Sequence, residues 1–392
     1  MTGPATDCLV VGAGIAGAAA GYFLAHHGHR VTLLEAEAAP GTHATGRSAA
    51  LFSEYYGNPT VRALTSASRP FYDAPPPDVH PGHSGPPAPL LRPRGVLALQ
   101  TPGSEALFAP ALAAGATAPQ PATALDAPGA RRLVPALRPG ACERAIHRPG
   151  ACDIDTDAVH SGFLRGLRAA GGTVVTRARV TALARRGGRW HAATTAGPHV
   201  APVLVNAAGA WADEVAALAG LAPAGLVPLR RTVAIAAVPP DQADAVARWP
   251  MICDLADTFY AKPEPGGLLL SPSDAMPFPP GDPRPDELGV AAALDRVRAV
   301  VALDLKHIRH AWAGLRTAPD DDTPVIGQHP AEPAFWWLAG LGGYGFQTAP
   351  AAATLLAALI AGREPSPGLA ALAPAVSPAR AGAAPSSRTR PR

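Results

Sequence analysis

The glycine pattern near the start of the sequence constrains the fold more than any other feature. An apolar segment, residues 8–11, precedes Gly12, Gly14 and Gly17 in G-x-G-x-x-G spacing, and the small residues of a candidate helix follow. Gly12 permits a tight turn, Gly14 lets the backbone approach a pyrophosphate, and Gly17 lets the helix pack closely on the strand. The N–H groups at the start of that helix would face the phosphates. The sequence therefore predicts a strand–turn–helix unit that binds a dinucleotide.

A second apolar segment supports this prediction and narrows the ligand. Residues 31–34 form a candidate strand that ends at Glu35, whose carboxylate is placed to accept a hydrogen bond from a ribose hydroxyl. No arginine follows within the next few residues to bind a 2′-phosphate. FAD or NAD therefore fits better than NADP, and this motif alone does not decide between the two.

Composition limits the remaining classes of protein. A chain of 392 residues with 48% hydrophobic residues is long enough to bury the cores of two domains. Charged residues make up only 16% and the net charge is +3, which gives no reason to expect binding to nucleic acid or to an anionic membrane. The four cysteines form no C-x-x-C pair, and we predict no metal site. Neither a leader pattern nor an apolar run long enough to span a membrane is found, so we expect a cytoplasmic protein with no transmembrane segment.

The order of candidate elements indicates an α/β protein with two domains built from discontinuous segments. We expect a Rossmann-like nucleotide-binding domain and a second, substrate-binding domain with a mostly antiparallel sheet. A proline-rich stretch at residues 74–93 marks the first exit from the nucleotide-binding domain, and a second strand-to-glycine turn at residues 203–211 marks a return to it. The expected boundaries are 1–90, 146–225 and 308–372 for the nucleotide-binding domain, 91–145 and 226–307 for the substrate-binding domain, and 373–392 for a disordered tail.

Six ordered motifs give the chain a resemblance to a known family. The sequence resembles the FAD-dependent D-amino-acid oxidase/glycine and sarcosine oxidase superfamily, and most of all the D-arginine dehydrogenase-type D-amino-acid dehydrogenases. The matching segments are residues 12–35, 45–50, 153–157, 206–211, 312–316 with 319–320 and 324–327, and 342–345. The resemblance implies that FAD is the dinucleotide and that its ring lies where the two domains meet.

The resemblance also implies the residues that contact the cofactor. Loop 45–50 would bring backbone N–H groups and the Ser48 hydroxyl to the flavin ring, and the glycines before the last long helix would approach its other edge. The expected cofactor-binding residues are Gly12, Gly14, Ile15, Gly17, Glu35, Ala36, Thr45, Arg47, Ser48, Ala49, Val180, Gly209, Gly342, Gly345 and Gln347. No cysteine occurs between residues 342 and 348, where the superfamily's covalent flavin linkage is made, so we expect non-covalent FAD.

Oxidation of an amino acid requires a group that holds its carboxylate, and arginine does this bidentately. The resemblance assigns that role to Arg316, with help from the hydroxyl of Tyr260. It adds Arg231, Tyr56 and Gly343 as further residues at the reacting centre. The implied reaction transfers the Cα hydride of a D-amino acid to flavin N5, and water then converts the imino acid to a keto acid and ammonia. Such a step depends on positioning and a neutral amine more than on a strong protein base.

Two departures from the D-arginine dehydrogenase-like pattern bear on the substrate. Leu51 stands where that pattern has histidine, and Gly95 stands where it has an acidic residue. Without that acid there is no partner for a cationic side chain, so we expect an apolar D-amino acid or imino acid.

The electron acceptor is a quinone, an electron carrier or O2. Lys262, two residues after Tyr260, lies where some oxidases of the superfamily place a lysine that assists oxygen, but dehydrogenase-like relatives share the Tyr-x-Lys-Pro pattern, and we favour a dehydrogenase. Three alternatives stay open: a glycine/sarcosine-type secondary-amine oxidase that uses O2, a flavin-binding partner protein without turnover, and, on the glycine pattern alone, an NAD-dependent dehydrogenase.

Overall fold

The computed structural model describes residues 6–80 and 88–380. A six-stranded sheet contains the first strand and has the order β20-β21-β13-β1-β2-β9. All neighbours in it are parallel except the edge strand β20, which is antiparallel to β21. The strands are β1 (Cys8–Val11), β2 (Val31–Leu34), β9 (Thr173–Val175), β13 (Val203–Asn206), β20 (Val325–His329) and β21 (Glu332–Ala339). This is the doubly covered sheet that the buried apolar segments predict.

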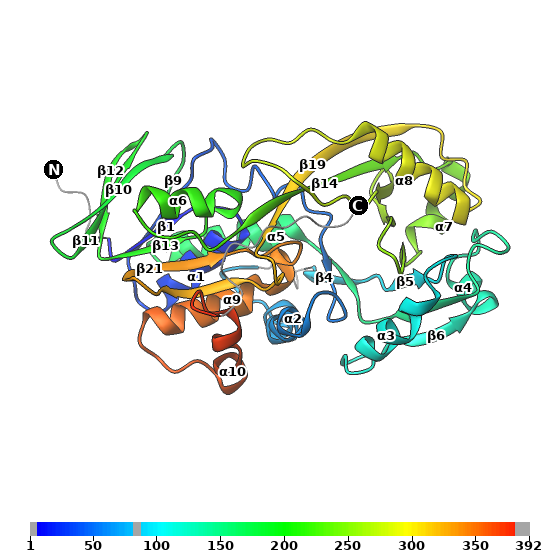
Figure 1. Cartoon of the computed structure of the whole chain (residues 1–392), viewed down its shortest axis with the longest axis horizontal. Helices are drawn as coiled ribbons and strands as arrows, with labels where there is room; N and C mark the ends of the chain where they lie inside the picture. The colour runs from blue at the N-terminus through cyan, green and yellow to red at the C-terminus, as the bar shows by residue number, and fades with distance from the viewer. Residues whose placement is uncertain (1–5, 81–87, 381–392) are drawn as a thin grey trace.

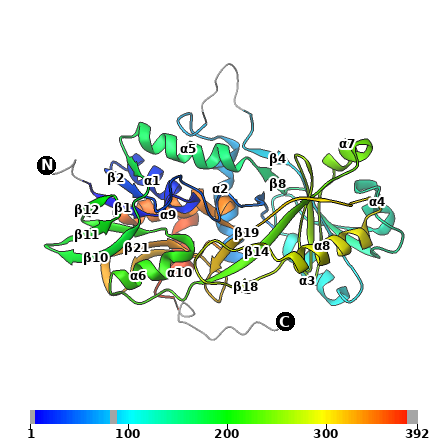
Figure 2. The same cartoon turned by 90° about the horizontal axis from the view of Figure 1, so that it is seen from above.

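Helices cover one face of this sheet, and a small sheet with a short helix covers the other (Figure 2). Leu9 and Val11 of β1 pack toward the small sheet, whereas Cys8 and Val10 pack toward the helices. The helices are α1 (Ile15–His26), α2 (Pro59–Asp73), α5 (Thr156–Ala169), α9 (Gly345–Ile360) and α10 (Pro367–Val376). The opposite layer contains β10 (Val180–Arg186), β11 (Arg189–Thr194), β12 (Gly197–Ala201) and α6 (Ala212–Leu218), with the turn η1 (Gly209–Trp211) before it.

A nine-stranded sheet forms the other half of the molecule, and its strands are antiparallel except for the pair β5 and β15. Figure 1 shows β14 and β19 running from the region of the first sheet into this half. Its strands are β5 (Val96–Leu99), β6 (Thr123–Asp126), β7 (Arg144–Arg148), β14 (Val227–Ala236), β15 (Met251–Asp254), β16 (Tyr260–Glu264), β17 (Gly267–Ser271), β18 (Met276–Pro277) and β19 (Ile308–Ala318). The helical elements near it are α3 (Glu105–Gly115), α4 (Ala127–Leu133), η2 (Pro240–Gln242), α7 (Ala243–Ala247) and α8 (Glu287–Val300).

Side-chain caps fix the start of several helices. The carboxylate of Asp155 accepts from the N–H of Ala158 at 3.0 Å, and Asn58 does the same for Val61 at 2.9 Å. Each bond satisfies an N–H group that has no partner within its own helix. A small sheet of β3 (Leu51–Phe52), β8 (Cys152–Ile154) and β4 (Leu91–Pro93) lies where the chain passes between the two halves.

The expected α/β fold with a Rossmann-like sheet and a mostly antiparallel second sheet is confirmed. Two details of the expected organisation are wrong. Residues 308–318, which we assigned to the nucleotide-binding domain, form β19 and hydrogen-bond along β14 in the nine-stranded sheet. Residues 373–380, assigned to a disordered tail, are ordered: α10 runs to Val376, whose side chain is fully buried, and Arg380 pairs with Asp321 at 2.8 Å. Residues 381–392 lie outside the described part of the chain, as do residues 81–87 of the proline-rich stretch.

Within residues 6–80 and 88–380, no helix combines the length and apolar character needed to cross a membrane.

Candidate functional site

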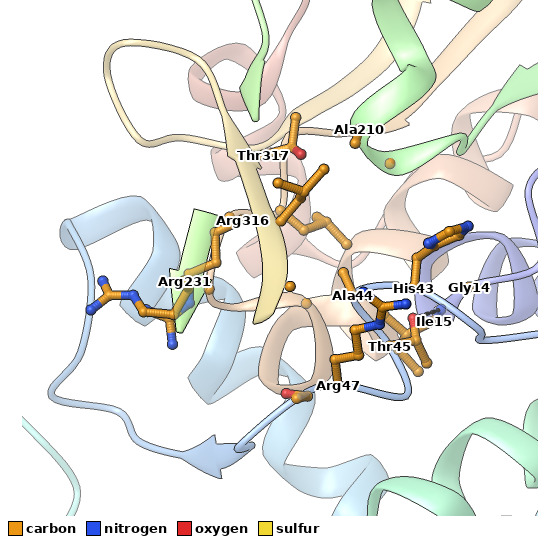
Figure 3. Close-up of a pocket in the computed structure, with 18 of the residues that line it drawn as sticks. Gly14, Ile15, His43, Ala44, Thr45, Arg47, Ala210, Arg231, Arg316 and Thr317 are labelled. Atoms are coloured by element: carbon orange, nitrogen blue, oxygen red, sulfur yellow. Dashed lines mark hydrogen bonds between the residues drawn. The ribbon is translucent and has the colours of Figure 1, made fainter. Parts of the chain in front are cut away.

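A cavity of about 640 Å³ joins the carboxyl ends of β1 and β2 to one face of the nine-stranded sheet. Carboxyl ends of parallel strands are the usual place for a ligand in an open α/β sheet. Figure 3 shows Gly14, Ile15, His43, Thr45 and Arg47 on one side of this cavity and Arg231 and Arg316 on the other. We describe the first side as the dinucleotide end and the second as the arginine end.

The glycines at the dinucleotide end leave no space for larger residues. A Cβ on Gly12, whose φ is +98°, would lie 2.6 Å from the carbonyl oxygen of Ala207, and a Cβ on Gly17 would lie 1.8 Å from the carbonyl oxygen of Gly12. Gly14 lines the cavity itself, and a Cβ there would meet only the Thr45 hydroxyl, at 3.0 Å. The turn therefore has the close backbone packing that a dinucleotide cradle needs.

Glu35 is buried and is held by two backbone amides. Its Oε2 accepts from the N–H of Ala13 at 2.8 Å, and its Oε1 accepts from the N–H of Glu37 at 2.9 Å. An ionised carboxylate has further lone pairs, so these bonds position it without preventing a bond from a ribose hydroxyl. His160 of α5 holds the same turn, because its Nε2 donates to the carbonyl oxygen of Ala13 at 2.8 Å. Burial lowers the pKa of His160, although the bond to Ala13 opposes this, and the ring is therefore neutral at pH 7.

The loop that follows β2 is attached to both halves of the molecule. The hydroxyl of Thr45 accepts from the N–H of Ile15 at 3.0 Å, at the first turn of α1. Arg47 donates to the carbonyl oxygen of Ala313 at 3.0 Å and pairs with Asp282 at 2.5 Å. Trp312 of β19 donates from Nε1 to the carbonyl oxygen of Arg47 at 3.0 Å. The loop is thereby fixed across the middle of the cavity.

Two arginines lie on one face of β14 and β19 at the other end. Arg231 is opposite Gly314, and Arg316 is opposite Leu229, so the two side chains are diagonal neighbours on the same face. Nε and Nη1 of Arg231 are buried and have no hydrogen-bond partner among the described residues. Burial lowers the pKa of Arg231, and the nearby positive charge of Arg316 lowers it further. Two neighbouring guanidinium groups, one of them with two unused buried donors, form a site for an anion, and a carboxylate matches their geometry.

Tyrosine hydroxyls complete this anion site. The hydroxyl of Tyr260 on β16 is buried and has no partner in the described part of the chain. The hydroxyl of Tyr56 accepts from Nη1 of Arg316 at 3.4 Å. Gly343 lies directly against the same guanidinium, since a Cβ there would approach its Cζ to 3.0 Å. Burial opposes the charge on Arg316, but Tyr56, Tyr260 and Asp257 together raise its pKa.

Lys262 lines the cavity near Tyr260, but it is not a free cation. Its side chain is buried, and its Nζ lies 3.1 Å from Oδ1 of Asp153 and 2.5 Å from Oε1 of Glu264. Asp153 also pairs with Arg94 at 2.7 Å. The four groups form a chain of alternating charges, Arg94–Asp153–Lys262–Glu264.

The structure brings the predicted residues together with two exceptions. Every residue that we assigned to the reacting centre, and every cofactor residue except Gly17 and Gln347, lines the cavity. Gly17 lies beneath the cradle, and Gln347 is buried against α2, where it donates to the hydroxyl of Thr65 at 2.8 Å. The individual roles of these residues stay predictions.

Sequence reasoning missed several residues of the site. His160 lies far from the glycine pattern in the sequence and carries no motif of its own. His43 packs against Trp211 with ring centroids 4.7 Å apart and pairs with Glu37 at 3.2 Å. Arg148 and Asp257 also line the arginine end. For Arg148, only the pairing of distant strands reveals that the residue faces the cavity.

The fold and the cavity define a class of protein: a two-part α/β protein with a dinucleotide cradle at one end of its cavity and a pair of arginines that suits an anion at the other. The chain belongs to the DAO family of FAD dependent oxidoreductases, whose family model matches residues 7–359. The expected superfamily, the enzymatic nature of the protein and FAD as its cofactor are thereby confirmed. The glycine cradle and the Glu35 carboxylate, with the tight contacts described above, fit FAD.

Individual relatives agree with this family. Glycine oxidase of Geobacillus kaustophilus (strain HTA426) is 25% identical over 375 residues, which cover 91% of this chain and 93% of that protein. A crystal structure of glycine oxidase from Geobacillus kaustophilus superimposes with a TM-score of 0.82 at 23% identity and covers 96% of this chain and 99% of that chain. Mitochondrial dimethylglycine dehydrogenase of Mus musculus is 26% identical over 233 residues, but the match spans only 26% of its length. The chain thus spans about a quarter of the dimethylglycine dehydrogenase that it matches.

Proposed function

We propose that the protein catalyses the FAD-dependent oxidative deamination of D-amino acids whose side chains are not cationic. The observation that carries this proposal is the pair Arg231 and Arg316, which face a cavity shared with the dinucleotide cradle. Two buried donors of Arg231, Nε and Nη1, have no partner among the described residues. An α-carboxylate satisfies both the charge and the hydrogen bonds of this pair. The glycine oxidase that resembles the chain along most of its length supports an amino-acid donor.

Each side chain at the arginine end then has a defined task. Arg316 holds the carboxylate of the substrate bidentately, and Arg231 adds charge from the neighbouring strand. Tyr260 donates its hydroxyl to the same carboxylate, and this satisfies an otherwise unpartnered buried group. FAD, when bound, supplies the acceptor for the two electrons and the hydrogen that leave Cα. The residues of the chain bind and orient the substrate, and this is where positioning lowers the barrier.

The amine of the substrate reacts in its neutral form. His43 is the histidine among the described cavity-lining residues, and it lies at the dinucleotide end, away from the arginine pair (Figure 3). The high positive charge at the arginine end lowers the pKa of a bound amine by repulsion, which favours the neutral form without a dedicated base.

The surroundings disfavour a cationic side chain. Asp153, the carboxylate nearest to the departure at Gly95, is already bonded to Arg94 and Lys262. The wall between β5 and β15 is apolar, with Val96, Ala98 and Met251 facing the cavity. We expect no carboxylate free to pair with a guanidinium or ammonium tail there.

We also propose that the enzyme is a dehydrogenase that passes its electrons to a quinone or an electron carrier and not to O2. The support is the bonding of Lys262, whose charge is offset by Asp153 and Glu264 and is therefore less able to stabilise a developing superoxide anion.

One anaerobic experiment tests the function. The purified enzyme is mixed with a panel of D-, L- and N-methyl amino acids, and bleaching of the flavin absorbance is recorded. We expect rapid bleaching with D-amino acids and slow or no bleaching with their L-enantiomers. Preference for sarcosine would instead favour a secondary-amine oxidase, and no bleaching with any compound would favour a flavin-binding partner protein. Reoxidation with air or with a soluble quinone then identifies the acceptor.

A further inference from the structure

A third arginine lies at the arginine end of the cavity, and the proposed reaction does not use it. Arg148 at the end of β7 is opposite Val96 of β5, and Val96 is opposite Met251 of β15. One strand further on, Cys253 of β15 is opposite Tyr260 of β16. Because opposite residues share a face of the sheet, Arg148 lies on the same face as Tyr260, across β5 and β15. All five residues line the cavity.

At least one buried donor of the Arg148 guanidinium is unpaired within the described part of the chain. Its Nε is buried without a hydrogen-bond partner among the described residues. Two carboxylates lie along the same wall, but both bond elsewhere: Asp254 accepts from the N–H and the hydroxyl of Thr258, both at 2.7 Å, and Asp257 accepts from the hydroxyl of Ser273 at 3.0 Å. A buried donor left unpaired costs free energy, and the cost is greater for a charged group. The position therefore suits an anion that enters from outside.

The wall between Arg148 and Tyr260 is apolar and uncharged. It consists of Val96, Ala98, Met251 and Cys253, and burial raises the pKa of the Cys253 thiol to about 12, so that this side chain stays neutral. A ligand that reached from the arginine pair to Arg148 would place an aliphatic stem along this surface. Its two ends would meet cations.

We propose that Arg148 binds a second anionic group of the substrate, so that the enzyme prefers amino acids with a carboxylate at each end of a short aliphatic stem. This inference rests on the proposed function and narrows it, because it replaces the apolar side chain expected from the sequence with an apolar stem that ends in an acid. The second carboxylate can be carried by the side chain, as in D-glutamate, or by a substituent on nitrogen, as in iminodiacetate. The two sources share the chemistry that Arg148 recognises.

Binding without turnover gives the first test. Glutarate and butyrate are titrated against the FAD-loaded enzyme, and dissociation constants are taken from the change in the flavin spectrum. A second charge-assisted contact predicts that glutarate binds roughly tenfold more tightly than butyrate. Arg148→Met should remove this difference, whereas Arg186→Met, which deletes an exposed arginine on β10, should preserve it. Arg148→Lys keeps the charge and should retain part of the preference, which separates loss of charge from a fold defect.

Turnover gives the second test and identifies the source of the second carboxylate. The ratio of kcat/KM for D-glutamate over D-glutamine reports an acid on the side chain, and the ratio for iminodiacetate over sarcosine reports an acid on nitrogen. At least one ratio should exceed about ten in the wild type and fall toward one in Arg148→Met. The FAD content and the melting temperature of each variant are measured alongside.

Three results would overturn the inference. Equal affinities for glutarate and butyrate would show that no second anion site exists. An unchanged substrate ratio in Arg148→Met would show that Arg148 does not contact the second group. A gain of activity on D-arginine with no change in the glutamate ratio would show that Arg148 only repels cations. Failure of the proposed function looks different, because then no amino acid, charged or uncharged, bleaches the flavin.

Discussion

At the scale of single residues, Arg316 offers the sharpest test of the carboxylate site. Arg316→Met removes the bidentate contact of the guanidinium but keeps an unbranched aliphatic stem. We expect kcat/KM to fall by a factor that corresponds to about 2–4 kcal/mol, with the larger part in KM. FAD content should be unchanged, because the dinucleotide cradle lies at the other end of the cavity.

Tyr260→Phe serves as the matched partner of this variant. It removes one neutral hydroxyl, so the fall in kcat/KM should correspond to about 1 kcal/mol. If kcat/KM for the same D-amino acid fell further in Tyr260→Phe than in Arg316→Met, the main carboxylate contact would have to be assigned to Tyr260.

His160 gives a prediction about pH. Its pKa in the folded protein is lowered by burial, so at acidic pH the unfolded chain binds a proton that the folded chain does not. The contribution of this histidine to stability is therefore complete above the unfolded pKa of about 6.5 and decreases as the pH falls below it, by at most about 1.4 kcal/mol per pH unit. In His160→Gln, the free energy of unfolding measured in urea between pH 7 and pH 5 should depend less steeply on pH. His191→Gln, an exposed position on β11, is the control and should leave the slope as it is.

At the scale of elements, α1 depends on its glycines to different degrees. A Cβ at Gly17 would lie 1.8 Å from a backbone oxygen that cannot move independently, whereas a Cβ at Gly21 would meet a Leu167 methyl group at 3.1 Å. Gly17→Ala should therefore displace α1 from β1, cost about 1–3 kcal/mol or more and reduce the FAD content of the purified protein. Gly21→Ala, on the same helix, should cost less and keep FAD. Denaturant unfolding measures the loss of stability, and the ratio of absorbance at 450 and 280 nm measures the FAD content. Similar values for the two variants would contradict this prediction.

Elements also show how far the sequence predicts this structure. The cradle is encoded locally, since the glycine spacing, the buried strands and Glu35 all lie within 30 residues, and its geometry was predicted correctly. The position of β19 was not predicted correctly. Its assignment depends on pairing with β14, whose residues are about 80 positions away in the chain. The end of α10 was missed because Ala and Pro dominate residues 373–380, and contacts with distant parts of the chain, the burial of Val376 and the pair Arg380–Asp321, order them.

The same distinction applies to the candidate site. Arg316, Tyr260 and the residues of loop 45–50 belong to motifs, and all of them line the cavity. Arg148 lies in no motif, and its position depends on the register between β7, β5 and β15, which single-sequence periodicity does not determine. A cavity residue whose position depends on strand register is therefore harder to predict from the sequence than one that belongs to a local motif.

At the scale of the whole molecule, the cavity lies between the two halves. Loop 45–50 bonds to α1 on one side and to β19 on the other, through Thr45, Arg47 and Trp312. A ligand that fills this cavity contacts both halves and binds only when they are assembled. FAD should therefore stabilise the folded protein as a whole, by about 2.7 kcal/mol when its free concentration is a hundred times its dissociation constant.

This leads to a prediction about how FAD is held. The described cysteine that lines the cavity is Cys253, which lies on β15 at the arginine end, and no cysteine occurs between residues 342 and 348. We expect non-covalent FAD that is released into the supernatant when the protein is precipitated with acid, and a melting temperature of the stripped protein that rises with added FAD. Flavin that stays with the precipitate would demonstrate a covalent bond. A melting temperature that does not respond to FAD would show that the cofactor does not link the two halves.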